Sequence, residues 1–141
     1  MFAESAPAKR VLVIEDDALD FAYVEHCLHL SIPECAEVTW ASTVEEARDI
    51  LSGQTFDLVV LDYQIGNRTP GSLVKLLRGE LGADPGRSVP IMVLSSVHPH
   101  LLEPFMQALD RSILLEKTEM TLNAFRNTIS ALGIPARYAL H

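Results

Sequence analysis

The chain has 141 residues, 48% of them hydrophobic and 21% charged, and a formal net charge of −8. That length and composition are typical of one globular domain, and the acidic balance argues against a nucleic-acid-binding domain, which is usually basic. With no apolar run of about 18 residues and no signal-peptide pattern in residues 1–9, we expect no membrane partner and a cytoplasmic location.

Five short segments of the chain are predicted strands, and four of them are rich in aliphatic residues. Most of them do not alternate between apolar and polar residues as a half-buried strand does. A continuous apolar run of this kind is typical of strands buried on both faces of a parallel sheet. The predicted strands occupy residues 10–14, 37–41, 58–61, 89–94 and 112–115. Pro90 falls at the start of the fourth strand, where its missing N–H is tolerated.

Apolar residues at helical spacing follow each predicted strand. Asp17 is the predicted N-cap of the first helix and either Ser42 or Thr43 that of the second, while Pro104 is expected in the first turn of the fourth. The predicted helices cover residues 18–30, 43–53, 72–81, a segment around 102–109, and one from 118 or 121 to 132. The inward side chains of the third helix are expected to be Leu73, Leu76, Leu77 and Leu81.

Five such units predict an α/β fold, a doubly wound five-stranded parallel sheet with five helices on its two faces. We expect the strand order 2-1-3-4-5, which is the flavodoxin-like arrangement. One domain over residues 10–133 accounts for the pattern, with a flexible tail at 1–9 and a short tail at 134–141. Cys27 and Cys35 form no paired motif and are expected to be free thiols.

Polar residues of particular kinds stand where four of the predicted strands end. Those that follow the first, third, fourth and fifth strands are Glu15 with Asp16, Asp62, Ser95 and Lys117. In a parallel sheet these ends meet at one edge, where open α/β sheets bind their ligands. Three carboxylates there repel one another, and hard oxygen ligands at a watery edge favour Mg²⁺. One aspartate beside such an ion is a nucleophile for a phosphoryl group, whose oxygens a lysine and a hydroxyl would bind.

This set of residues resembles the receiver domain of two-component response regulators of the chemotaxis-regulator type. That family has an acidic pair after the first strand, an aspartate after the third, a serine or threonine after the fourth and a lysine after the fifth. The resemblance runs from about residue 10 to 132. It implies that Asp62 is the phosphoacceptor and that Ser95 and Lys117 bind the phosphoryl group. The implied Mg²⁺ ligands are Glu15, Asp16, Asp62 and the backbone carbonyl of Gln64. Asp17 is either a third acid of the site or only a helix cap.

The resemblance implies a phosphorylation-dependent signalling protein. A sensor histidine kinase or a histidine phosphotransfer protein would donate the phosphoryl group, and a monomer or weak homodimer would pass the signal on through protein contacts. Catalysis would be limited to the domain's own Mg²⁺-dependent phosphorylation and dephosphorylation. The alternative is a pseudo-receiver that binds partners without phosphate, against which the complete set of site residues argues. A phosphohydrolase of the haloacid dehalogenase type needs Asp-x-Asp after the first strand, and residues 15–17 do not supply it.

Three positions depart from the family pattern. The loop at residues 63–71 is about a residue longer than usual, Thr118 replaces a proline after the lysine, and Leu114 replaces an aromatic residue before it. By the resemblance, that aromatic ring turns inward when the phosphoryl group draws the hydroxyl of Ser95 toward it. Leu114 has less volume and no polar tip, so we expect a weaker change around the fifth strand and the last helix.

Overall fold

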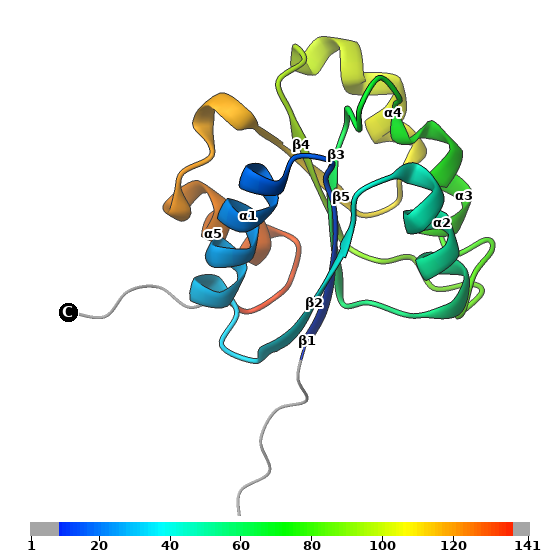
Figure 1. Cartoon of the computed structure of the whole chain (residues 1–141), viewed down its shortest axis with the longest axis horizontal. Coiled ribbons are helices and arrows are strands. Elements are labelled where there is room, and N and C mark those ends of the chain that lie inside the picture. Colours follow the sequence, from blue (N-terminus) through cyan, green and yellow to red (C-terminus); the bar gives the residue numbers. More distant parts are fainter. Residues whose placement is uncertain (1–8, 137–141) are drawn as a thin grey trace, which may run out of the picture.

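The computed structural model describes residues 9–136, so the predicted tail residues 1–8 and 137–141 lie outside it. Five strands form one sheet (Figure 1). They are β1 Lys9–Ile14, β2 Cys35–Ala41, β3 Leu58–Asp62, β4 Ile91–Ser95 and β5 Ser112–Glu116. Neighbouring strands are parallel and their order is β2-β1-β3-β4-β5, which confirms the predicted doubly wound fold.

Helices cover both faces of the sheet. The α-helices are α1 Ala18–Ser31, α2 Val44–Gly53, α3 Val74–Leu77, α4 Glu103–Ala108 and α5 Leu122–Ala131. Short 3₁₀ helices are η1 Pro70–Leu73, η2 Pro99–Leu102 and η3 Lys117–Glu119. Helices α1 and α5 lie on one face, and α2, α3 and α4 lie on the other (Figure 1). Within residues 9–136, no helix combines the length and the apolar character needed to span a membrane.

The core consists of two apolar clusters, one on each face of the sheet. In β1, Val11 and Val13 belong to the cluster under α1 and α5, whereas Leu12 and Ile14 belong to the cluster under α2 to α4. Successive side chains of a strand point to opposite faces, so burial on both faces requires an unbroken apolar run. All five residues of β3 and of β4 are buried, which explains the continuous aliphatic segments of the sequence.

Side-chain caps fix where the longer helices begin. Asp17 accepts hydrogen bonds from the backbone N–H groups of Leu19 and Asp20 at the start of α1, as predicted. Thr43 caps α2 and Thr121 caps α5, which settles the two alternatives that the sequence left open. Each cap satisfies backbone donors that have no partner within the first turn of a helix. Pro104 lies in the first turn of α4, also as predicted.

The third helix is shorter than the spacing of leucines predicts. A helix was expected over residues 72–81, but η1 and the one-turn α3 replace it and the helical backbone ends at Leu77. Leu81, expected to point inward, is 56% exposed. The physical reason is the backbone of Gly79 and Gly82, whose φ angles of 74° and 114° are incompatible with a right-handed helix. The helix predicted around 102–109 is α4, Glu103–Ala108, and the 3₁₀ helix η2 directly precedes it.

Gly79 should tolerate no side chain. A Cβ atom there would lie 2.3 Å from the backbone oxygen of Arg87, in addition to the strain of its positive φ. We expect Gly79→Ala to lower the free energy of unfolding in urea by about 3 kcal/mol or more. Gly86→Ala is the matched control, because Gly86 also has a positive φ but an added Cβ would meet nothing within 4 Å. Its expected cost is about 1 kcal/mol, and equal losses in the two variants would contradict the steric argument.

Candidate functional site

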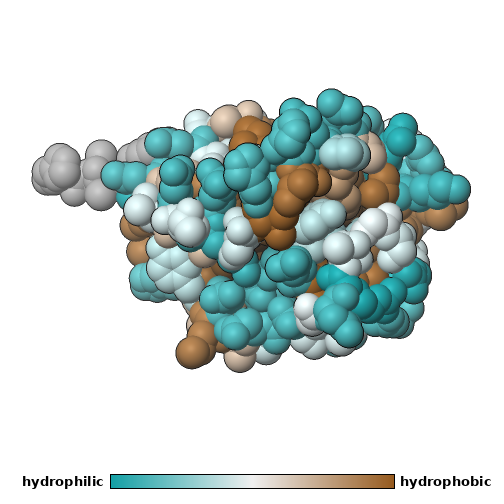
Figure 2. All heavy atoms as spheres, turned by 90° about the horizontal axis from the view of Figure 1, so that it is seen from above, coloured by the Kyte–Doolittle hydropathy of each residue, from teal (hydrophilic) through white to brown (hydrophobic). Residues whose placement is uncertain are grey.

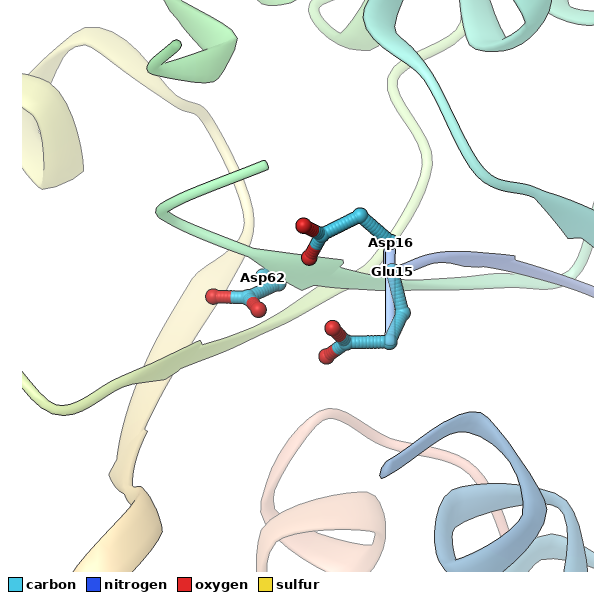
Figure 3. Close-up of side chains that lie close together, drawn as sticks. All are labelled: Glu15, Asp16 and Asp62. Carbon is cyan, nitrogen blue, oxygen red and sulfur yellow. The ribbon is translucent and has the colours of Figure 1, made fainter. Parts of the chain in front are cut away.

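Three carboxylates meet at the edge of the sheet where the strands end. Glu15 and Asp16 follow β1, and Asp62 is the last residue of β3 (Figure 3). One carboxylate oxygen from each of the three lies within 4.8 Å of those of the other two. Among residues 9–136 no other group of three or more acidic, histidine or cysteine side chains converges in this way. The structure thus brings together the three acids that the sequence predicted as metal ligands.

Asp62 is held in a fixed orientation although its side chain is almost fully buried, with 4% of the residue exposed. Its Oδ1 accepts a hydrogen bond of 3.0 Å from the backbone N–H of Gln64. Its Oδ2 accepts one of 2.8 Å from Nζ of Lys117. Charge-assisted bonds of this kind compensate for the desolvation of a buried carboxylate. The carboxylate of Asp62 is therefore held in one orientation at this edge of the sheet, with Lys117 on one oxygen.

Lys117 lies between three carboxylates. Besides Asp62, its Nζ lies 3.3 Å from Oδ2 of Asp20 and 3.6 Å from Oε2 of Glu15. Burial by itself would lower the pKa of the ammonium group, but the hydrogen bond and charge of Asp62, with the charge of Glu15, outweigh it and raise the pKa. Lys117 is therefore a permanent cation of the site. Asp20, on the first turn of α1, was not predicted as its partner, because nothing in the sequence shows how closely α1 approaches the end of β5.

Glu15 is the acid that lacks a complete set of partners. It is 2% exposed, and its Oε1 accepts a hydrogen bond from the backbone N–H of Asp17. Its buried Oε2 has no hydrogen-bond partner within the described residues. Burial, together with the neighbouring Asp62, raises the pKa of Glu15 to about 8. The Oε2 atom of Glu15 is a buried acceptor without a hydrogen bond, and two further carboxylates lie beside it. A bound cation would satisfy this acceptor and offset the negative charges, so these residues fit a divalent metal ion.

Asp16 is exposed and fastens the loop that follows β3. Its Oδ2 accepts a hydrogen bond of 2.9 Å from the backbone N–H of Gly66. That loop closes on itself through a bridge between Ile65 and Arg68, and Arg68 forms an ion pair with Glu45 of α2. Asp16 is thus tied to the segment that the sequence marks as longer than usual.

Gln64 and Ser95 lie beside Asp62, and their predicted roles stay predictions. Gln64 directly follows Tyr63 in the loop, and its backbone N–H is engaged with Asp62. Ser95 is the last residue of β4, is 2% exposed, and accepts a hydrogen bond of 2.8 Å at Oγ from the backbone N–H of Val97. Both residues are therefore ordered at the same edge as Asp62.

Trp40, near the end of β2, makes a direct contact with the acidic residues that follow β1. Its Nε1–H donates a hydrogen bond of 2.6 Å to the backbone oxygen of Glu15, and its ring stacks on Phe21. Asp17, by contrast, uses its carboxylate as the cap of α1.

Hydrophilic side chains cover most of this end of the molecule, with apolar groups gathered near its middle (Figure 2).

Many of the solved structures that match this chain are response regulator receiver domains. No protein-family model and no curated protein matches the sequence. The chemotaxis response regulator CheY4 of Vibrio cholerae matches with a TM-score of 0.72 and 20% identity, over 89% of this chain and 98% of that one. A response regulator receiver protein from Sinorhizobium medicae matches at 0.69 and 24%, over 89% and 94%. The receiver domain of a sensor histidine kinase from Pseudomonas aeruginosa, with a magnesium ion in its active-site cleft, matches at 0.68 and 19%, over 89% and 98%. At these identities the likeness establishes that the chain has the CheY-like receiver fold.

Proposed function

We propose that this protein, which has the fold of response regulator receiver domains, accepts a phosphoryl group on Asp62 in a two-component phosphorelay. The donor would be a sensor histidine kinase or a histidine phosphotransfer protein, and the signal would leave through protein contacts in the cytoplasm. One observation carries the proposal: Asp62 ends β3 with Lys117 on one oxygen and with Glu15 and Asp16 close enough to share a cation with it. No contact with nucleic acid or membrane is part of the proposal.

The transfer follows from the arrangement of these side chains. An ionised oxygen of Asp62 attacks the phosphorus of a phosphohistidine, a P–O bond forms, and the P–N bond breaks to leave the donor's imidazole. A carboxylate that attacks as a nucleophile has no proton to lose, so this step needs no general base. Glu15, Asp16, Asp62 and the backbone carbonyl of Gln64 would hold Mg²⁺. A magnesium ion at this position supplies positive charge that offsets the negative oxygens of the phosphoryl group.

Lys117 and Ser95 would hold the phosphoryl group after transfer. The ammonium group of Lys117 lies 2.8 Å from Oδ2 of Asp62. A small movement would let it pair with an oxygen of the phosphoryl group bound to Asp62. The Ser95 hydroxyl would donate a hydrogen bond to a phosphoryl oxygen. Its Oγ accepts a hydrogen bond from the Val97 N–H, and its own hydrogen bond to the Val97 oxygen is long, at 3.5 Å, and therefore easily exchanged. The proposed catalysis is limited to the phosphorylation and dephosphorylation of Asp62 itself.

A pseudo-receiver, which would bind partners without phosphate, is the second candidate. It would need none of the features that stabilise an ionised Asp62, and the complete set of acids, lysine and serine favours phosphorylation instead. The two candidates differ in one measurement. A receiver that can be phosphorylated on Asp62 responds to Mg²⁺ with beryllofluoride, a mimic of the phosphoryl group, whereas a pseudo-receiver does not.

Beryllofluoride with Mg²⁺ should change the backbone amide NMR signals mainly near the site. We expect large shifts at residues 63–71 and 95–100 and modest shifts at 112–126. The reason is Leu114, which pairs with Val93 and is partly buried against the cluster under α2 to α4, so it lacks the large inward turn of an aromatic ring. Leu114→Phe is the informative variant and should extend the shifts to 112–126. Absence of any shift would contradict the proposed function, whereas cooperative shifts throughout α5 in the natural chain would contradict only the role of Leu114.

A further inference from the structure

Both backbone polar groups of Glu15 are bound by consecutive residues of β2. The backbone N–H of Glu15 donates a hydrogen bond of 3.0 Å to the carbonyl oxygen of Ala41, which extends the β1–β2 ladder by one residue. Its carbonyl oxygen accepts a hydrogen bond of 2.6 Å from the indole N–H of Trp40 rather than from a backbone N–H of β2. Because Glu15 is buried, loss of that donor would leave a backbone acceptor without its partner.

The carbonyl group of Glu15 belongs to the same rigid peptide plane as the N–H of Asp16. A donor that fixes this oxygen therefore fixes the plane from which the Cα–Cβ bond of Asp16 departs. Asp16 is exposed, and its carboxylate accepts a hydrogen bond from the backbone N–H of Gly66, in a surface loop. The direction in which Asp16 faces Glu15 and Asp62 thus depends on how firmly the peptide bond before it is held.

The ring of Trp40 is itself held in place. It stacks on Phe21 of α1 with ring centroids 4.4 Å apart and an angle of 7° between the planes. Phe21 also donates its backbone N–H to the carbonyl oxygen of Asp17, so it is anchored next to the same acidic turn, residues 15–17. Stacked aromatic pairs have few accessible rotamers, and this one joins α1 to the edge strand β2. The indole is 38% exposed, which indicates that its place is not determined by burial alone.

We propose that Trp40 is a positioning residue for the metal site: its indole N–H orients the Glu15–Asp16 peptide and thereby sets the affinity of the carboxylates for Mg²⁺. The inference rests on the proposed function, since it concerns the same cation. Residues that orient metal ligands from outside the coordination sphere typically contribute about 10- to 100-fold to metal affinity. Trp40 acts through the backbone rather than on a ligand atom, so we expect the lower end of this range.

The test compares the Mg²⁺ affinity of three variants with that of the natural chain by isothermal titration calorimetry, with thermal unfolding measured in parallel. Replacement of Trp40 by β-(3-benzothienyl)alanine keeps the fused ring and the stack on Phe21 but removes the donor, and Trp40→Phe removes the donor with a smaller ring. Tyr23→Phe is the matched control, because the Tyr23 hydroxyl also donates to a backbone carbonyl, that of Met120 at 2.9 Å, away from the acidic turn. We expect the dissociation constant for Mg²⁺ to rise roughly tenfold in both Trp40 variants and to stay unchanged in Tyr23→Phe.

Each other outcome has a distinct meaning. Mg²⁺ binding by the Trp40 variants with the affinity of the natural chain would overturn the inference and leave the proposed metal site intact. An equal loss of affinity in Tyr23→Phe would overturn it too, because the effect would then follow the stability of α1 rather than the indole donor. Failure of the natural chain itself to bind Mg²⁺ would refute the proposed metal site, and the role of Trp40 with it.

Discussion

Asp62→Asn should abolish phosphorylation. When the natural chain is incubated with acetyl phosphate and Mg²⁺, we expect an acyl phosphate that is labile in acid and base. The variant should show only background label, because an amide oxygen is a poor nucleophile and the carboxylate is the group that Lys117 orients at 2.8 Å. Borohydride reduction followed by peptide mass spectrometry would locate the label. The fold should survive, since Asn keeps an acceptor for the backbone N–H of Gln64.

Asp57→Asn is the control for this experiment. Asp57 directly precedes β3, at the opposite end of the strand from Asp62, and accepts a hydrogen bond of 2.8 Å from the backbone N–H of Arg10. Within residues 9–136, no cationic side chain forms an ion pair with Asp57 that would orient it for attack, and its variant should be labelled as fully as the natural chain. A label mapped to Asp57, or a labelled Asp62→Asn chain, would show that the acceptor is assigned to the wrong end of β3.

Asp16→Asn should remove both Mg²⁺ binding and labelling by acetyl phosphate. The substitution keeps an oxygen that can accept the hydrogen bond from Gly66, so it takes away the negative charge and leaves the loop fastened. We expect the Mg²⁺ affinity measured by calorimetry to fall by at least about a hundredfold, beyond the usual effect of losing an outer-sphere partner. Labelling should fall with it, because Lys117 alone would face the negative oxygens of the donor.

Asp17→Asn distinguishes the acid that binds the ion from the one that caps a helix. Asp17 accepts hydrogen bonds from two backbone N–H groups at the start of α1 and lies outside the group of three convergent carboxylates. Asn is as good an N-cap as Asp, so neither stability nor Mg²⁺ affinity should change much. Normal labelling of Asp16→Asn together with weak labelling of Asp17→Asn would reverse the two roles.

The sequence predicted the sheet well because its strands are buried on both faces. A continuous aliphatic run such as that of β3 has few alternatives once helical segments alternate with it, and the chirality of crossover connections then limits the topology. The third helix was predicted poorly because leucine spacing continues past its end. What stops it is the left-handed backbone of Gly79 and Gly82, and a glycine in a sequence does not state its φ angle.

The convergence of the three acids was predictable because they stand at the ends of two strands, β1 and β3, and parallel strands end at one edge. Side-chain contacts between different helices and strands could not be predicted. Asp20 reaches Lys117 only because the first turn of α1 passes close to the segment after β5, and Trp40 reaches the carbonyl of Glu15 only because β1 and β2 are in this register. Such contacts depend on distances between elements, which hydrophobic periodicity does not encode.

The acidic edge is assembled from distant parts of the chain, since Glu15 follows β1, Asp62 ends β3 and Lys117 follows β5. Every parallel pairing in this sheet needs a crossover, so the edge exists only after the non-local pairings are complete. A ligand that binds only the native state adds about 2.7 kcal/mol to the free energy of unfolding at a hundred times its dissociation constant. Magnesium would therefore act on the folding equilibrium of the whole domain. The concentration of the ion around the protein would influence how often the chain unfolds, and so its exposure to proteases, as well as its ability to be phosphorylated.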